Sequence, residues 1–498
     1  GPSYMRRFFE KFNPYSTTVL ETRIIKTQHM KILPSELMET NFANQQMVTF
    51  NFPPYKCSFR ILDGQMTVRY VVKNSQNTGR YNNTAPAADN EKGALFKPYL
   101  LANLWKRVTL VINGQELKFN YDYALVHFVT KLLTIRRDEL EYERRKTGFA
   151  IPRVHYLPDK GQMAGADAAD RIAHPLMTIP NCTTADNGTW TIPFYEEVYK
   201  EFKVPNTART LTVSGNLPHP LMNEKKFWPP ECPISLKLEP NHVAKIFYAR
   251  DNKTPSLKIE SITFTDTVIT VSDDMVDKSV DTIIKSGSGF QFPFQKLETN
   301  YHNMKSAQVI DFPRVLQGPW PRAIIIGFVP IASRTESKAE TTKFMSKFPP
   351  LVNITVYNGE QEYPRKGGIT FRDVPSYANT NSMSDYYTET QLEDLIEANL
   401  DIVDELRKVF AKESQLPHLD WDAKQFFTNQ CWIPISFTPL DRNAEVPDVV
   451  FAKETGEMGI KLEMQHGIDG EKWSMCVISI RDADMELQPP TWTVAGSF

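Results

Sequence analysis

The stretch Arg107-Val-Thr-Leu-Val-Ile-Asn-Gly114 places apolar residues at every second position and ends in an Asn-Gly pair. A period of two predicts a strand with one face in a core. Asn-Gly predicts a tight hairpin turn, because both residues accept positive φ. The stretch Leu351-Val-Asn-Ile-Thr-Val-Tyr-Asn-Gly359 has the same plan. The two stretches together predict a β protein in which one plan is used twice.

Strand patterns dominate the rest of the chain. Val48, Phe50 and Phe52 occupy alternate positions, and similar strand patterns recur at 66–72, 234–238, 257–259, 262–264, 268–271, 323–329, 460–464 and 475–480. Proline is abundant, at 35 of 498 residues, and it disfavours helix interiors. The length suits two large β domains or three smaller ones. We therefore predict an all-β fold built from two sandwiches.

Two segments have the helical period instead of the strand period. The first runs from about Tyr121 to Arg145 and the second from about Glu389 to Lys412. In each, apolar residues recur three and four positions apart and charged residues cover the other face. Thr388 and Gln391 have the spacing of a capping box at the start of the second helix. Each helix is expected to pack its apolar stripe on a sheet or at a domain edge.

The order of elements indicates an internal duplication. Each hairpin is followed by tyrosines, a long helix and then a strand that opens Pro-Ile-Ser, at Pro233 and at Pro434. If these strands are equivalent, 119 residues separate Gly114 from Pro233 and 75 separate Gly359 from Pro434. The first half would then carry about 44 additional residues. We assign them to the Ala-, Asp- and Thr-rich segment 148–209, whose composition is typical of an exposed excursion.

The join between the halves is predicted near Lys285-Ser-Gly-Ser-Gly289, where glycine and serine interrupt the pattern. The expected organisation is an N-terminal arm over residues 1–40, a first sandwich over 41–285 with its excursion at 148–209, and a second sandwich over 286–498.

The net charge of −2 gives no support for general nucleic-acid binding. The segment from Met5 to Met30 is an exception, because five basic residues face two acidic ones there. It is either a solvated tail or an arm that docks on something acidic. The five cysteines are scattered without a CxxC pair, which argues against a disulfide framework or a zinc site. No apolar run approaches the length of a transmembrane helix.

No catalytic constellation stands out. The nine histidines form neither HxH nor HExxH, and GxSxG and phosphate-loop motifs do not occur. His127, beside Phe128 on the first helix, is expected to be structural. Acidic pairs such as Asp273-Asp274 and Asp482/Asp484 could serve a glycosidase but are common in β proteins. We therefore predict no catalytic, cofactor-binding or metal-binding residues, and expect a structural or binding protein.

One region adds a family resemblance. It begins at Leu297 and contains Phe312-Pro-Arg-Val-Leu-Gln-Gly-Pro-Trp-Pro-Arg-Ala-Ile-Ile-Ile-Gly-Phe-Val329, then Phe348-Pro-Pro350 and Phe371-Arg-Asp-Val374. This order resembles the second jelly roll of Maverick/Polinton and adintovirus major capsid proteins, where a Gly-x-x-Pro-x-Arg element leads into an apolar strand. Residues 318–322 resemble that element, with Arg322 directly after Pro321, and residues 347–349 echo the family's Asn-Pro-Phe segment loosely.

The resemblance extends over roughly residues 40–490. Ser214-Gly-Asn-Leu-Pro-His-Pro-Leu-Met222 and the strand after Pro233 are similar to the first jelly roll's Pro-Leu-His region. Trp432 to Pro439 resembles the family's Phe-Asp-Leu-Thr-Pro-like strand, from which Ser436 and Phe437 depart.

The resemblance implies a hexon-like fold of two tandem eight-stranded jelly rolls, each with an inserted helix and long loops. It implies a major capsid protein whose homotrimers form pseudo-hexagonal capsomers of an icosahedral dsDNA virus or virus-like transposon. The implied partners are other copies of the chain, penton and minor capsid proteins. The excursion at 148–209 would be a tower or trimer clasp. The basic arm would be an inward tether to minor proteins or packaged DNA.

The implied location is the virion, after synthesis in the host cytoplasm. The alternative is a secreted or surface tandem-sandwich binding protein, such as a lectin or attachment protein. It would be expected to have a secretion signal and often disulfides, for which the sequence shows no pattern. A β-sandwich glycosidase is a third possibility.

Overall fold

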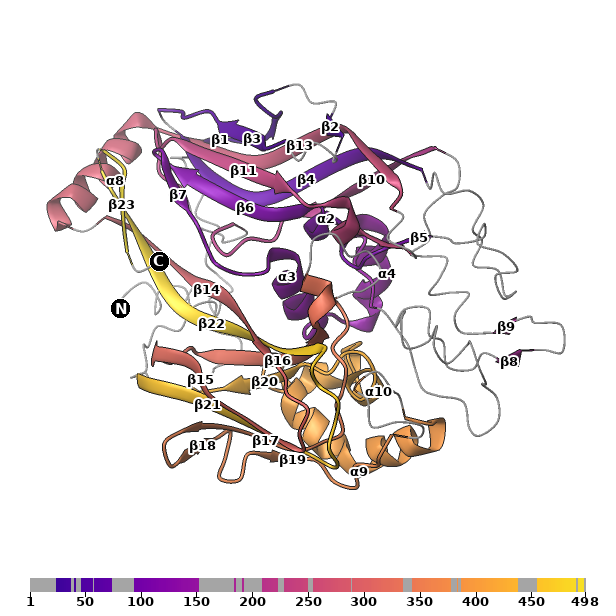
Figure 1. Cartoon of the computed structure of the whole chain (residues 1–498). Coiled ribbons are helices and arrows are strands. Elements are labelled where there is room, and N and C mark those ends of the chain that lie inside the picture. The colour runs from indigo at the N-terminus through magenta and orange to yellow at the C-terminus, as the bar shows by residue number, and fades with distance from the viewer. Residues whose placement is uncertain are drawn as a thin grey trace, which may run out of the picture.

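The computed structural model describes residues 24–36, 40–41, 46–56, 58–73, 94–151, 183–184, 190–191, 208–222, 228–249, 254–287, 289–334, 343–377, 383, 387–437, 455–489 and 491–496. These residues form two β-sandwiches with helices between and beside them, the first above the second in Figure 1.

The first sandwich consists of two facing sheets. One has the order β1-β13-β4-β10, with β2 added to β13, and the other has the order β3-β11-β6-β7. Their bounds are β1 Ile24–Ile32, β2 Thr40–Asn41, β3 Val48–Phe52, β4 Ser58–Lys73, β6 Trp105–Ile112, β7 Gln115–Leu117, β10 Arg209–Asn216, β11 Ile234–Pro240 and β13 Ser256–Val271. Two small two-stranded sheets lie outside these sheets: β5 Ala94–Phe96 pairs with β12 Phe247–Ala249, and β8 Thr183–Thr184 pairs with β9 Trp190–Thr191.

The second sandwich repeats this arrangement. One sheet has the order β14-β22-β16-β20 with β23 added to β22, and the facing sheet has the order β15-β21-β17-β18 with β19 added to β17. Their bounds are β14 Phe290–Asn303, β15 Val309–Pro319, β16 Ala323–Pro330, β17 Leu351–Asn358, β18 Gln361–Tyr363, β19 Ile369–Thr370, β20 Ile433–Ser436, β21 Thr455–Met464, β22 Trp473–Gln488 and β23 Thr493–Gly496.

The winding of the main strands is the same in both sandwiches. The eight strands on the main paths of the two large sheets can be counted in chain order within each sandwich. One sheet then joins the first, eighth, third and sixth strands, and the facing sheet joins the second, seventh, fourth and fifth. Two four-stranded antiparallel sheets wound in this way make a jelly roll. The predicted all-β fold of two tandem eight-stranded jelly rolls is therefore confirmed.

Alternating strands supply the core of each jelly roll. In β11, Ile234, Leu236 and Leu238 are buried while the residues between them are partly exposed. In β16, residues 323–329 are all buried. A strand buried on both faces reads as a continuous apolar run, which is the pattern that Ala323-Ile-Ile-Ile shows.

The predicted equivalence of the two Pro-Ile-Ser strands is wrong. The strand after Pro233 is β11, the seventh strand, which pairs with β3 and β6. The strand at Pro434 is β20, the sixth strand, which pairs with β16. Three shared residues carry no information about which sheet a strand joins. Measured to the true sixth strands, 95 residues follow Gly114 and 74 follow Gly359, so the excess before this strand is 21 residues and not about 44.

The first predicted helix is divided into two. α3 spans Tyr123–Leu132 and α4 spans Arg137–Thr147. Between them Arg136 is extended and forms a β-bridge with Leu419, which belongs to the second jelly roll. A tertiary contact thus interrupts a segment whose local period is helical throughout.

The second predicted helix is α9, Glu389–Arg407, which ends five residues before the predicted Lys412. The capping box of Thr388 and Gln391 is confirmed in both directions. The sequence prediction missed α8, Asp273–Ser286, which joins the two jelly rolls. Short helical turns complete the fold: α2 Leu100–Asn103, α7 Val243–Ile246, η4 Ile331–Arg334, η5 Glu413–His418 and α10 Ala423–Phe426.

The two Asn-Gly hairpins differ by one residue in register. In the first, Ile112 pairs with Gln115, and Asn113 and Gly114 both have positive φ, as predicted. In the second, Asn358 itself pairs with Gln361, so the turn consists of Gly359 and Glu360 and only the glycine needs positive φ. Both types of turn suit the twist of a hairpin.

Part of the predicted N-terminal arm belongs to the first jelly roll. Ile24–Ile32 forms β1, the edge strand, in antiparallel register with β13 from Ile24 opposite Val271 to Ile32 opposite Phe264. The expected N-terminal arm over residues 1–40 is therefore wrong for β1, which is part of the first sandwich. The remaining basic residues of the arm before Ile24 lie outside the described residues.

Candidate functional site at the junction of the two jelly rolls

The two jelly rolls meet along a continuous junction. The first contributes the segment after β7, helix α3 and residues 217–222 and 228. The second contributes β14 and the segment 343–348. Three aromatic pairs among the described residues cross it: Phe119 with Phe294 at 5.6 Å between ring centroids, Phe128 with Phe344 at 5.2 Å, and Trp228 with Phe292 at 4.6 Å. All six side chains are at least nine-tenths buried, so the junction has a buried aromatic core.

A polar cluster around Asp122 crosses the same junction. Lys343 Nζ lies 2.5 Å from Asp122 Oδ1 and 2.7 Å from Oδ2. The hydroxyl of Tyr301, on β14, donates to Oδ2 at 2.8 Å, and the backbone N–H of Asp122 donates to Thr299 Oγ1 at 3.0 Å. Asp122 of the first jelly roll is thus held by three residues of the second, two at its carboxylate and one at its backbone N–H.

Electrostatics keep Asp122 ionised. Burial by itself would raise the pKa of this carboxyl, but the Lys343 ammonium and the Tyr301 hydroxyl outweigh burial and hold the pKa below its usual value. A carboxyl with a lowered folded pKa stabilises the fold above its unfolded pKa of about 3.9. That stabilisation is lost as the pH falls through the lower folded value.

Further bonds extend the junction beyond this cluster. Lys245 Nζ donates to the carbonyl of Ser333 at 2.6 Å, and Asn113 Nδ2 donates to the carbonyl of Thr491 at 2.7 Å. The backbone N–H of Asp420 donates to the carbonyl of Ile135 at 3.1 Å. Backbone and side-chain bonds therefore fix the orientation of one jelly roll against the other along the length of the junction.

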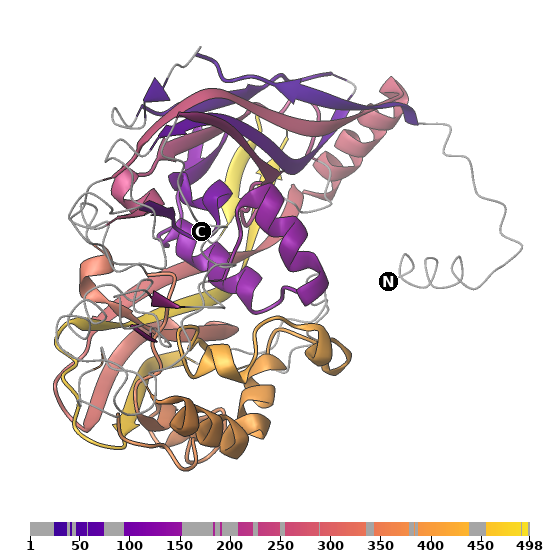
Figure 2. The ribbon, with the colours of Figure 1, turned by 90° about the vertical axis from the view of Figure 1, so that its right-hand side faces the viewer.

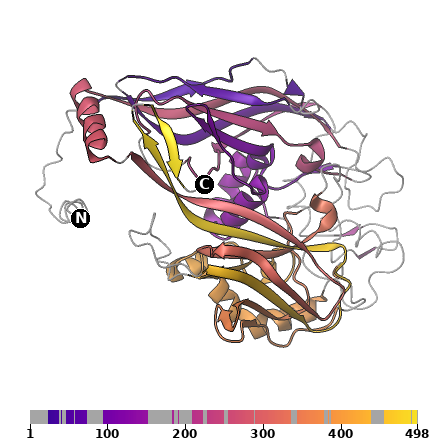
Figure 3. The ribbon, with the colours of Figure 1, turned by 60° about the vertical axis from the view of Figure 1, so that its left-hand side comes forward.

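The helices inserted between the fifth and sixth strands lie at the same end of both jelly rolls. Figure 2 shows α3 and α4 above α9 on one face of the molecule. The linking helix α8 stands at the far end, as Figure 3 shows. The inserted segments also touch, through the Arg136–Leu419 bridge and an ion pair of Arg137 with Asp422 at 3.9 Å. Equivalent ends of the two jelly rolls thus point the same way.

Members of the two acidic pairs considered for a glycosidase, and His127, make structural contacts. Asp274 pairs with Lys278 on the exposed face of α8, and Asp482 lies 3.5 Å from Arg322. His127 is buried and its Nε2 lies 2.9 Å from the Tyr121 hydroxyl, which agrees with the structural role expected for it. In the described part of the chain, no three His, Cys, Asp or Glu side chains gather in a way that could hold a metal ion.

The cysteines in the described part of the chain form no disulfide. Cys232, Cys431 and Cys476 are free and buried, while the other two cysteines lie outside the described residues. Within the described ranges, no helix has the length and apolar character needed to cross a membrane. The excursion 148–209 is described only at 148–151, 183–184, 190–191 and 208–209, so its predicted role as a tower or clasp lies outside the described residues.

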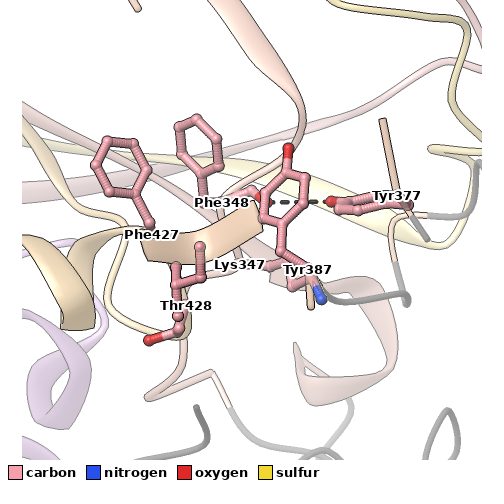
Figure 4. Close-up of a pocket in the computed structure, with 7 residues that line it drawn as sticks. Lys347, Phe348, Tyr377, Tyr387, Phe427 and Thr428 are labelled. Carbon is pink, nitrogen blue, oxygen red and sulfur yellow. Dashed lines mark hydrogen bonds between the residues drawn. The ribbon is translucent and has the colours of Figure 1, made fainter. Parts of the chain in front are cut away.

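One small pocket lies at the start of α9, and the sequence prediction missed it. It holds about 210 Å³ of empty space, including the part open to solvent, and Figure 4 shows the aromatic rings that line it. Tyr377 donates its hydroxyl to the carbonyl of Phe348 at 3.1 Å, and Lys347 Nζ lies 5.5 Å from the Tyr377 ring centroid. The hydroxyl of Tyr387 is buried there without a partner in the described residues. The lining suits aromatic packing and contains no acid–base pair.

No protein-family model matches the chain, and no curated protein matches its sequence. Solved structures do match. A chain in the cryo-EM structure of the Sputnik virophage aligns with a TM-score of 0.52 and 11% identity, over 98% of this chain and 91% of that one. A chain of the PBCV-1 capsid aligns with a TM-score of 0.47 and 9% identity, over 97% and 99%.

The mavirus major capsid protein aligns with a TM-score of 0.44 and 10% identity, over 98% of this chain and 94% of that one. At these identities a match concerns the fold alone, and the Sputnik alignment, with a TM-score above 0.5, supports that fold. That alignment over nearly the whole chain agrees with the winding of the strands in both halves, and together they identify the protein as a double jelly roll.

Proposed function

We propose that this protein is the major capsid protein of an icosahedral virus and acts by assembling, without catalysis. The observation that carries the proposal is the placement of two jelly rolls of identical winding, with equivalent ends pointing the same way, in one chain. A shell subunit needs a broad body with all its loops at two opposite ends, because one end faces outward and the other inward.

The same geometry supports a homotrimer. Three copies of a chain with two similar bodies place six bodies around one threefold axis, and closed cyclic symmetry of this kind is usual for soluble oligomers. The outline is then pseudo-hexagonal and can tile a flat facet. The junction already fixes the orientation of the two jelly rolls within one chain. Assembly of a trimer therefore requires only new contacts between chains.

The finer assignments belong to the same proposal. The family resemblance favours the Maverick/Polinton and adintovirus group, with a double-stranded DNA genome, penton and minor capsid proteins as partners, and the virion as the location. The proposed division is a first jelly roll through residue 285 and a second from residue 286, now with β1 inside the first. The proposed inward tether is then confined to the basic residues before Ile24.

Size-exclusion chromatography with light scattering tests the proposal. The expected species has three times the chain mass of 57.1 kDa, with negative-stain images of six-sided particles. A homogeneous monomer at micromolar concentration would contradict it and favour the tandem-sandwich binding protein, which needs no self-association.

A further inference from the structure

His219 has both ring nitrogens constrained. It follows β10 at the junction and is 4% exposed. Its Nδ1 accepts a hydrogen bond from the backbone N–H of Leu221 at 3.1 Å. A nitrogen that accepts carries no proton, so the neutral ring must carry its proton on Nε2. That Nε2 is buried without a partner among the described residues. The geometry therefore accommodates only the neutral imidazole.

One aromatic ring separates His219 from the second jelly roll. Phe119 packs on His219 at 5.8 Å between centroids and on Phe294 of β14 at 5.6 Å. The neighbouring His127 packs on Tyr123 at 4.8 Å. Burial lowers the pKa of both histidines to about 3, and for His127 the nearby His219 adds to the effect.

The carboxyl of Asp122 and the phenols around the two histidines keep their protonation states in mild acid. Asp122 stays ionised because its pKa is already low, and burial raises the pKa of Tyr121, Tyr123 and Tyr301, so these phenols stay neutral. Lys343 is held by Asp122 and Lys245 by the Ser333 carbonyl. Lys97 differs, since burial and the two lysines lower its pKa strongly, and its Nζ donates to the Ala244 carbonyl.

We propose that the junction is an acid-sensitive catch, in which a proton taken up at Nδ1 of His219 replaces the hydrogen bond from Leu221 and releases the Phe119–Phe294 contact. In the opened junction His219 is solvated and regains a pKa of about 6.5. The closed state binds no proton there until the pH approaches 3. The closed junction therefore keeps its full stability above pH 6.5 and loses it as the pH falls below that value. The opening equilibrium should rise about tenfold per pH unit for each such histidine.

Hydrogen exchange of the full chain, measured by mass spectrometry between pH 7.5 and pH 5.0, tests the catch. Protection factors are corrected for the intrinsic pH dependence of exchange. Peptides covering 117–128 and 217–222 should lose protection by about thirtyfold or more between pH 7.5 and 5.0. Peptides from the inner strands β4 and β11 should lose much less, because the jelly rolls open at the junction before either unfolds.

The variant His219→Asn isolates the residue. Asparagine Oδ1 can accept from the Leu221 N–H as Nδ1 does, and it cannot be protonated. In H219N, the protection of the junction peptides should depend less steeply on pH than in the wild type. The slope should be smaller by about a factor of ten per pH unit. The matched control is His418→Asn, at an exposed histidine on η5, which should keep the wild-type slope.

Three results would overturn the proposal. The first is protection at the junction that does not change with pH, and the second is an unchanged slope in H219N. The third is a simultaneous loss of protection at the junction and in the inner strands. If H219N fails to fold, the wild-type comparison of junction with inner strands still decides, and His127→Gln provides a second variant that can still bond the Tyr121 hydroxyl.

Discussion

Trp228 of the first jelly roll stacks on Phe292 of the second, with ring centroids 4.6 Å apart and planes inclined by 22°. Trp228 is 1% exposed and Phe292 is 3% exposed, although each belongs to a different jelly roll. The contact shows that the jelly rolls bury side chains against each other as fully as within their own cores. Stability of the chain should therefore depend on the junction as well as on either sandwich.

Phe292→Ala should lower the free energy of unfolding by about 3–5 kcal/mol, because it removes a buried ring and leaves a cavity beside Trp228. Denaturant unfolding of the full chain measures it. Val309→Ala, at a side chain that is 51% exposed on β15, is the control and should change stability by about 0.5 kcal/mol or less. Equal effects of the two substitutions would mean that packing across the junction does not contribute to the free energy of unfolding.

Lys343→Met should destabilise the chain by about 3 kcal/mol, because it leaves the Asp122 carboxylate without its counter-charge. The side chains are 11% and 21% exposed, so the lower end of the range for buried pairs applies. The control is Lys278→Met, which breaks a pair with Asp274 in which both side chains are 74% exposed. That change should alter stability by less than about 1 kcal/mol. A Lys343→Met effect as small as the control's would contradict a buried linkage.

Gly327→Ala should destabilise the second jelly roll by about 1–3 kcal/mol or more through overpacking. A Cβ at this position of β16 would lie 2.2 Å from a ring atom of Trp432, a fully buried side chain. Gly467→Ala is the matched control, because a Cβ there meets nothing within 4 Å. Thermal unfolding of both variants gives the comparison, and a neutral Gly327→Ala would show that Trp432 does not occupy this site.

Thr388→Ala should cost about 1 kcal/mol by removing the side-chain acceptor of the α9 capping box. The Thr388 hydroxyl accepts from the backbone N–H of Gln391 at 3.2 Å, and the Gln391 side chain accepts from the backbone N–H of Thr388 at 3.0 Å. Thr388→Ser keeps the hydroxyl and should stay within a few tenths of a kcal/mol of the parent. Chemical denaturation would contradict the cap if both variants were equally destabilised.

Cys232, Cys431 and Cys476 should resist alkylation at pH 8 in the native protein. Burial raises the pKa of Cys232 to about 12 and raises those of the other two thiols further above their usual value. The thiolate is the reactive form, so buried neutral thiols react slowly. Peptide mapping should find these three unmodified before denaturation and modified after it. Rapid native labelling of Cys476 would mean that the β14–β22 region opens readily.

Local sequence predicted what depends on neighbours along the chain. Alternating residues predicted β6, β11 and β17, because a half-buried strand needs an apolar residue at every second position. The capping box of Thr388 and Gln391 was also predictable, since both partners lie within one turn of helix. The absence of any local catalytic motif led to the expectation of a structural or binding protein.

Contacts between distant segments decided the features that the sequence prediction missed. The break after α3 arises where Arg136 meets Leu419, and no residue near Arg136 signals it. The sheet membership of β11 and β20 differs although both open Pro-Ile-Ser, because a strand's place depends on which partners remain unpaired. His219 lies far along the chain from Phe294, so the candidate catch could be found only in the folded chain.

By itself the sequence determined that the chain is a β protein with one plan used twice, because side-chain alternation and turn residues act through neighbours on the same strand. Only the tertiary structure decided how the two jelly rolls face each other, where Asp122 meets Lys343, and which way their ends point. The physical reason is that burial and charge pairing are properties of surfaces brought together by folding, and no short stretch of residues contains both surfaces.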